Sequence, residues 1–327
     1  MVASSVALAA AGLTLSSPVC CESTSVPSLS TLIPAKVAQL PPDLNIRECK
    51  VTLYQFESCP FCRKARAVLD LCNVPYDVVE VNPLTKSETK SFAGDYKKVP
   101  IVVVEDPKTK NSYQIRDSKI IITAVLNSSP GVSIAFNNSS TRLPKPTSLN
   151  EETVFDEKTF EKLSIDETWI KWIESYLLQL VVVNIYGTMS ESKETFDYLL
   201  THRDFGWAWK QASYWAGSIV MNQVARSRLG KFKHIQGRHR EAFFDACNDL
   251  GSAAVAAGGF IGGSKPSPAD LNAYGVIRSL EGTRSLREAI EGDKAGLEFK
   301  KWYANMNAAV GESKARSKLG TTQRGSQ

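Results

Sequence analysis

Apolar and polar positions follow a regular order from about residue 50 onward. The segment KVTLYQF, residues 50–56, is rich in β-branched and aromatic side chains and has the bounded length of a strand. Residues 59–73 then carry apolar side chains at helical spacing. The same criteria predict strands at 76–81, 99–105 and 112–117, and helices at 84–96 and 119–126. The order β-α-β-α-β-β-α indicates an α/β domain.

The connections predict how these strands pair. Helices separate the first three strands, and a strand-helix-strand unit usually leaves its two strands parallel. The third and fourth strands are joined by the short turn DPKTKN, which favours an antiparallel hairpin. We therefore expect a mostly parallel sheet with one antiparallel pair.

The pattern changes after residue 127. Residues 127–150 are rich in Ser, Asn and Pro and indicate a linker. Ser267, Pro268 and Asp270 form a capping-box start for a later helix, with aspartate in place of the usual glutamate. Helical periodicity with little strand character marks residues 167–186, 207–229, 239–257 and 267–282. The second half is therefore predicted to be all-helical.

The first forty residues differ from the rest in being rich in Ser, Ala and small apolar residues, with no basic residue before Lys36. Their apolar stretch at 6–15 is too short to span a bilayer, and the positive start of a secretory signal is missing. An organellar transit peptide, a disordered tail and the remnant of a membrane anchor remain open.

Composition narrows the class of protein. A chain of 327 residues with 43% hydrophobic residues has room for two domains with their own cores. Its net charge of +5 falls short of the dense basic surface of a nucleic-acid binder. Seven cysteines at scattered spacing are unlike a secreted disulfide framework and favour a reducing compartment.

The stretch ESCPFCRK carries the candidate chemistry. A strand ending near residue 56 and a helix beginning near residue 60 place Cys59 at a helix N-terminus, where free backbone N–H groups and the helix dipole stabilise a thiolate. Cys62 follows one turn later and could attack a mixed disulfide at Cys59. Arg63, Lys64 and Arg66 add positive potential. Cys59 is therefore the candidate nucleophile.

Two other interpretations of the cysteine pair stay open. A C-x-x-C pair can be half of a zinc site, but no second pair at ligand spacing is found among Cys49, Cys72, Cys247, His202, His234 and His239, so we expect no metal. The pair could also be purely structural. The strand-to-helix junction, and a Val99–Pro100 step that could place a cis-proline opposite the thiol, favour redox or thiol chemistry.

Several stretches together resemble the membrane-associated prostaglandin E synthase 2 family of the glutathione-transferase superfamily. They are LYQFESCPFCRKARAVLD, YDVVEVNPLTKSE, YKKVPIVVVE, IRDSKIIITAVL and FIGGSKPSPADLNAYGVIRSLEG. The resemblance covers about residues 50–302 and implies an α/β thioredoxin/glutaredoxin-like domain followed by an all-α domain like the C-terminal domain of glutathione transferases. The expected parts are a targeting or tethering segment (1–42), the glutaredoxin-like domain (48–127), a linker (128–165), the helical domain (166–310) and a disordered tail (311–327).

The resemblance also implies roles for individual residues. Cys59 becomes the essential thiol and Cys62 its companion. The implied glutathione contacts are Val99, Pro100, Asp117 and Ser118, although plain helix capping would also explain Asp117 and Ser118. The implied substrate pocket contains Tyr54, Phe56 and Phe61. His234 falls where the family has a histidine near haem propionates, and a solvent-exposed basic helix end would also explain the stretch that contains it.

The activity implied by the resemblance is glutathione-dependent isomerisation of prostaglandin H2, or a related lipid endoperoxide, to prostaglandin E2. Phe56 stands where the family often has a tyrosine, which gives weight to two alternatives: a glutathione- and haem-binding redox protein, and a glutaredoxin-like disulfide reductase. We further expect a homodimer, membrane association through the N-terminal segment, no nucleic-acid partner, and an organellar (mitochondrion or plastid) or membrane-associated location, with the cytoplasm as the alternative.

Overall fold

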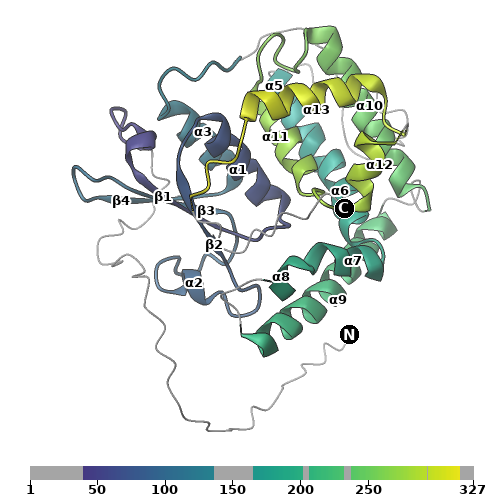
Figure 1. The fold of residues 1–327 in the computed structure, drawn as a ribbon, viewed down its shortest axis with the longest axis horizontal. Coiled ribbons are helices and arrows are strands. Elements are labelled where there is room, and N and C mark those ends of the chain that lie inside the picture. Colours follow the sequence, from purple (N-terminus) through teal and green to yellow (C-terminus); the bar gives the residue numbers. More distant parts are fainter. Residues whose placement is uncertain (1–39, 136–164, 202–205, 232–236, 293, 317–327) are drawn as a thin grey trace.

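A sheet unit and a body of helices lie side by side in the computed structural model, which describes residues 40–135, 165–201, 206–231, 237–292 and 294–316 (Figure 1). The sheet unit confirms the predicted order of strands and helices. Its strands are β1 (Lys50–Gln55), β2 (Tyr76–Glu80), β3 (Ile101–Glu105) and β4 (Ser112–Arg116), and its helices are η2 (Ile46–Glu48), α1 (Pro60–Leu71), α2 (Ser87–Lys90) and α3 (Ser118–Asn127).

The sheet is mixed, and the prediction of a mostly parallel sheet is wrong. Its four strands lie in the order β2-β1-β3-β4. Among its neighbouring strands, only β1 and β2 form a parallel pair, whereas β3 runs antiparallel to both β1 and β4. The predicted helix at 84–96 shrinks to the four residues of α2 because Lys86 and Gly94 adopt positive φ angles that interrupt it. Strand β3 begins at the edge of the sheet where β1 and β2 end, as its antiparallel pairing with β1 requires.

Each face of the sheet has its own apolar contacts. Val51 and Leu53 point toward α1 and α3 and join the main core. Tyr54, on the opposite face, packs with Ile101 and Val103 in a smaller cluster that includes side chains from the segment between β2 and β3. This alternation is the period of a strand buried on both faces, and it fixes the register of β1.

The helical body confirms the predicted all-helical second half. All four predicted segments contain helices, although the first also holds a π turn, η3 (Ile173–Leu177). Helices that the pattern did not single out include α13, which packs on α10 and carries the buried Trp302. The helices are α5 (Ile165–Trp172), α6 (Leu178–Tyr186), α7 (Met189–Phe196), α8 (Tyr198–Thr201), α9 (Trp207–Lys231), α10 (His239–Ala257), α11 (Pro268–Arg278), α12 (Arg284–Ile290) and α13 (Leu297–Val310).

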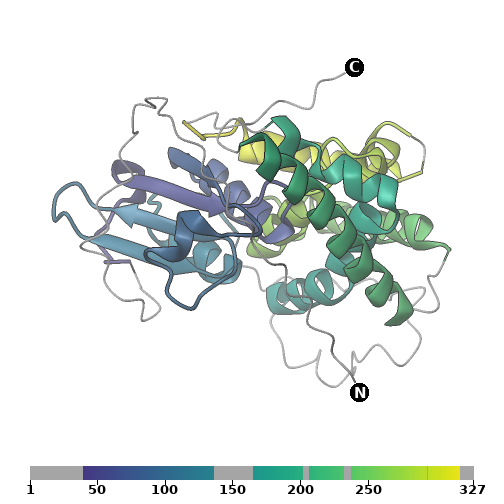
Figure 2. The same cartoon turned by 90° about the horizontal axis from the view of Figure 1, so that it is seen from below.

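Helices α1 and α11 join the two units, and both views show the sheet unit against the helices (Figure 2). Gly275 on α11 lies so close to α1 that a Cβ atom there would meet the Lys64 Cα at 2.5 Å. Any side chain at 275 would therefore push α1 and the thiols that it carries away from α11.

The chain beyond α13 returns to the sheet. Arg316 donates its backbone N–H to the Tyr76 carbonyl at 2.8 Å, and Tyr76 donates to the Lys314 carbonyl at 3.2 Å. Residues 314–316 thus pair with the outer edge of β2, and they belong to the segment from residue 311 for which the sequence predicts a disordered tail.

Candidate functional site

The register of the sheet gathers the predicted site residues at one edge. Tyr54 pairs with Ile101, which also pairs with Arg116. Strands β1 and β4 therefore end at the level where β3 begins, and the residues just beyond these strand ends are neighbours. These residues are Phe56, Val99, Pro100 and Asp117.

The first thiol lies where the sequence predicts it. Cys59 is the N-cap residue of α1, and Pro60 occupies the first helical position, where its missing N–H removes no helical hydrogen bond. Cys59 is partly exposed, whereas Cys62 is completely buried. Of this pair, only Cys59 is open to a ligand from solvent.

The environments of the two thiols drive their pKa values apart. The Cys62 thiol donates a hydrogen bond to the Cys59 sulfur, and this bond, with the backbone N–H groups of Phe61 and Cys62 and the charge of Lys64, lowers the pKa of Cys59 against the opposing effect of burial. Burial, followed by the neighbouring Cys59, raises the pKa of Cys62 well above that of an ordinary thiol. Cys59 is therefore the thiolate of the pair.

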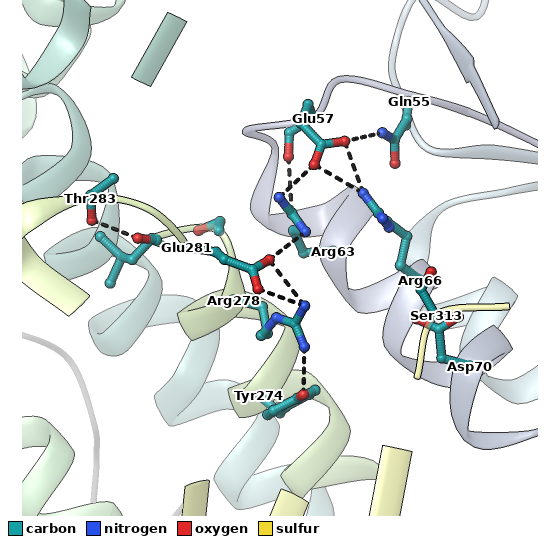
Figure 3. Close-up of polar contacts among 12 residues, drawn as sticks. Gln55, Glu57, Arg63, Arg66, Asp70, Tyr274, Arg278, Glu281, Thr283 and Ser313 are labelled. Carbon is teal, nitrogen blue, oxygen red and sulfur yellow. Dashed lines mark hydrogen bonds and ion pairs between the residues drawn. The ribbon is translucent and has the colours of Figure 1, made fainter. Parts of the chain in front are cut away.

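Two of the three cations predicted to act on the thiol form ion pairs with a carboxylate instead. Arg63 and Arg66 both bind the Glu57 carboxylate, at 2.6 and 2.8 Å (Figure 3). Arg63 also donates to the Glu57 carbonyl at 3.0 Å and to Glu281, beyond α11, at 2.9 Å. These arginines fix the turn before Cys59 against the helical body, and their charge is largely matched by carboxylates.

Lys64 is the cation that acts on the thiol. Its ammonium group is completely buried, and its nearest ionic partner is Glu174 on the π turn, at 3.5 Å. Glu174 binds Lys119 more closely, at 2.7 Å. Burial lowers the pKa of Lys64, but the remaining positive charge favours the Cys59 thiolate. A buried ammonium with one long ion pair exerts a strong local field.

Replacing Lys64 by methionine is expected to raise the pKa of Cys59, because the substitution keeps the length of the side chain and removes its charge. The pH at which iodoacetamide modifies Cys59 at half its maximal rate should move upward, as measured by mass spectrometry of the labelled peptide. Lys119→Met is the matched control, since Lys119 binds the same Glu174. Equal profiles for wild type and Lys64→Met would show that Lys64 does not act on the thiol.

The predicted glutathione contacts occupy conformations suited to binding. The Val99–Pro100 peptide bond is cis. Asp117 is the N-cap of α3 with φ at +72°, and its carboxylate accepts the Lys119 N–H at 2.8 Å. The capping interpretation of Asp117 is therefore confirmed, and it leaves the second carboxylate oxygen available to a ligand. Ser118 is buried at the first position of α3.

The predicted substrate-pocket residues divide between two places. Tyr54 and Phe56 belong to one apolar cluster, as expected from their shared strand face, and the Tyr54 ring packs on Phe92 at 4.9 Å. Burial raises the pKa of Tyr54. Phe61 lies outside this cluster on α1, 40% exposed, with the Lys64 ammonium 5.4 Å from its ring centre.

Sequence reasoning missed a phenol in the same cluster as Phe56. Tyr96 packs there, 5.0 Å from the Arg116 guanidinium, and a backbone hydrogen bond links it to Asp117. Burial raises its pKa. It belongs to the predicted helix at 84–96, and only the turn that replaces the end of this helix brings it to the site.

Some predictions meet no test in this structure. His234 lies outside the described residues, so its haem contact stays a prediction. No cluster of three or more His, Cys, Asp or Glu placed to hold a metal ion occurs among the described residues. Within the same ranges, every helix is too short or too polar to cross a bilayer.

Comparison with known proteins shows which families this chain resembles. A profile described as Glutathione S-transferase, N-terminal domain, matches residues 53–133. Glutaredoxin 1 of Rickettsia felis is 37% identical over 59 residues, or 17% of this chain and 58% of that protein. Glutaredoxin 2 of Salmonella typhimurium, solved in complex with glutathione, superimposes with a TM-score of 0.46 at 16% identity, covering 80% of this chain and 94% of that chain.

Two relatives match most of the chain. Prostaglandin E synthase 2 of Mus musculus is 30% identical over 299 residues, which cover 84% of this chain and 73% of the relative. The protein of the same name from Danio rerio is 31% identical over 285 residues, covering 80% and 72%. With its mixed thioredoxin-like sheet and its helical second half, the chain belongs to the prostaglandin E synthase 2 family.

Proposed function

We propose that this protein is a thiol-dependent isomerase that converts prostaglandin H2, or a related lipid endoperoxide, to the 9-keto-11-hydroxy product, with Cys59 as its nucleophile. The observation that carries the proposal is the partly exposed Cys59 at the N-terminus of α1, with a pKa lowered by Cys62 and Lys64. A thiolate at neutral pH is the nucleophile that an O–O bond requires.

The reaction balances without an external oxidant. The Cys59 sulfur attacks the endoperoxide oxygen on C9, an S–O bond forms, the O–O bond breaks, and the oxygen on C11 takes a proton to become the hydroxyl. Loss of the C9 proton then forms the ketone while the S–O bond breaks and returns the thiolate. The substrate is oxidised at C9 and reduced at the O–O bond, so its composition does not change.

Glutathione fits the edge of the sheet as the companion thiol. The backbone of Val99 precedes a cis-proline and could pair with the cysteinyl part of the tripeptide, as a strand pairs with its neighbour. The open first turn of α3 suits the γ-glutamyl carboxylate, and the free oxygen of Asp117 suits its ammonium. When bound, glutathione would supply a second thiol beside Cys59.

Replacing Asp117 by asparagine is expected to weaken glutathione binding by about 1–3 kcal/mol, the contribution of a charge-assisted hydrogen bond. Asparagine keeps the cap on Lys119 and tolerates the positive φ angle, so only the charge is lost. Calorimetric titration of both proteins measures the difference. Equal affinities, with equal melting temperatures, would mean that Asp117 is only a cap.

A second candidate function is glutaredoxin-like disulfide exchange. The hydrogen bond between Cys62 and Cys59 favours it, because a companion thiol at this distance can attack a mixed disulfide at Cys59. The two candidates share the nucleophile and differ in the need for Cys62.

The deciding experiment is an assay of the full chain with prostaglandin H2, with and without glutathione and haem, beside an assay with a glutathione mixed disulfide. Formation of prostaglandin E2 above the rate of spontaneous decay supports the isomerase. Disulfide turnover alone would select the second candidate. The homodimer, the cellular location and the five-part division of the chain stay predictions.

A further inference from the structure

The carboxyl group of Glu80 is buried near the two thiols and has no role in the functions proposed above. Glu80 is the last residue of β2 and is 6% exposed. It alternates with Tyr76 and Val78, whose side chains join the core under α1, so its carboxyl points to the same face. It pairs in register with Gln55, the last residue of β1, which stands four residues before Cys59.

Hydrogen bonds hold the Glu80 carboxyl from three directions. One oxygen accepts the Glu57 backbone N–H at 2.8 Å, and the other accepts the Gln55 amide at 3.3 Å. The Tyr198 phenol, on α8 of the helical body, donates a third. Burying a carboxyl group between the two units costs free energy, and these three hydrogen bonds offset that cost and fix its orientation.

Glu57 and Glu80 have pKa values shifted in opposite directions. Burial would raise the pKa of Glu57, but Arg63 and Arg66 outweigh it and hold that pKa at about 2. Burial and the neighbouring Glu57 charge raise the pKa of Glu80 to about 8. Two carboxyls separated in this way divide between a permanent anion and a group that exchanges a proton near neutral pH.

Glu80 also lies near the buried thiol of Cys62. Two consecutive backbone N–H groups donate to the two side chains. The Phe56 N–H donates to the Cys62 sulfur, and the Glu57 N–H donates to the Glu80 carboxylate. The Glu80 charge is one of the causes that raise the pKa of Cys62. A buried thiol of high pKa must lose its proton before it can attack a disulfide, and the Cys62 side chain is completely buried.

We propose that Glu80 is the proton acceptor for Cys62 in the disulfide exchange suggested above, on which this inference rests. The Cys62 sulfur bonds to Cys59, the bond between Cys59 and glutathione breaks, and glutathione leaves as the thiolate. The proton of Cys62 passes to the Glu80 carboxylate. The two cysteines are thereby oxidised to a disulfide, and the departing glutathione is reduced.

The pH dependence follows from the groups that face Glu80. A carboxylate accepts the proton, so glutathione release should rise with pH through about pH 8, the pKa of Glu80. The titratable groups that interact with Glu80 are Glu57 before α1, Cys62 on α1 and Tyr198 on α8. Arg63 and Arg66 act on it through Glu57, and Tyr186 on α6 acts on Tyr198.

The test mixes reduced protein with the mixed disulfide of glutathione and thionitrobenzoate, from pH 6 to 10. Release of thionitrobenzoate, followed by absorbance, reports attack by Cys59. Release of glutathione, followed by acid quench and mass spectrometry, reports attack by Cys62. The variant is Glu80→Gln, which keeps an acceptor for the Glu57 N–H, and the matched control is Glu105→Gln, at the far end of β3.

The variant should release glutathione on the order of 10²-fold more slowly at pH 9, without the rise near pH 8. If Glu80 acted only as a charge that raises the pKa of Cys62, its removal would speed release instead, and the proposal would be overturned. An unchanged pH profile would overturn it as well. Failure of wild type to form the mixed disulfide at Cys59 would instead refute the proposed thiol exchange itself.

A second variant covers the case in which Glu80→Gln does not fold. The Tyr198 hydrogen bond lowers the pKa of Glu80, so Tyr198→Phe should move the midpoint of glutathione release to higher pH. A midpoint that stays in place would contradict proton transfer to Glu80.

Discussion

Replacing Cys59 by serine is expected to lower the rate of prostaglandin E2 formation by about 10³-fold or more, since the hydroxyl keeps the shape of the thiol but is not ionised at neutral pH. The position at the N-terminus of α1 stabilises a thiolate and cannot ionise an alcohol. Chromatographic measurement of product, corrected for spontaneous decay of prostaglandin H2, gives the rate.

Cys62→Ser is the matched control, because it changes the buried member of the same pair. The isomerisation needs no second thiol from the chain, so this variant should keep activity within about tenfold, the loss reflecting the missing hydrogen bond to Cys59. If both variants lost activity equally, the isomerisation would need both thiols, and the proposed mechanism with Cys59 as the sole thiol of the chain would be wrong.

The thiol site could be predicted because its determinants are local. A strand, a C-P-x-C sequence and an apolar helix specify a helix N-terminus at Cys59 without reference to the rest of the chain. Capping at Asp117 and at Ser267 is local in the same way, and the structure confirms both. Tyr54 and Phe56 share a face because a strand alternates its side chains.

The direction of β3 could not be predicted from strand order. It depends on whether residues 81–100 form a crossover helix, and this segment has helical apolar spacing that two positive φ angles override, at Lys86 and Gly94. The same turn brings Tyr96 to Phe56. Such a turn is set by packing against the rest of the chain, so the apolar periodicity of the sequence does not reveal it.

The roles of the cations depend on partners far away in sequence. Arg63, Lys64 and Arg66 look equivalent in the sequence, yet Arg63 meets Glu281 and Lys64 meets Glu174. Arg66 binds Glu57 before its own helix. Which cation acts on the thiol is therefore decided by the packing of α11 and the π turn against α1, and a charge count cannot decide it.

Asp270 is the residue whose loss should destabilise the chain most. Its carboxylate is completely buried and accepts the backbone N–H groups of Ile261, Gly262 and Ser267 at 2.8, 3.0 and 2.9 Å. The Trp302 indole of α13 adds another bond at 2.8 Å. One side chain thus joins the start of α11, the preceding loop and the last helix.

Asp270→Ala is expected to lower the free energy of unfolding by about 3–5 kcal/mol, because it leaves several buried donors without an acceptor. Urea titration followed by tryptophan fluorescence measures the change, and Asp245→Ala, at an exposed site on α10, should cost less than about 0.5 kcal/mol. Since α11 packs against α1, the variant should also expose Cys62 to alkylation. A cost below about 1 kcal/mol would show that water replaces the carboxylate and that the network is not what holds α11 in place.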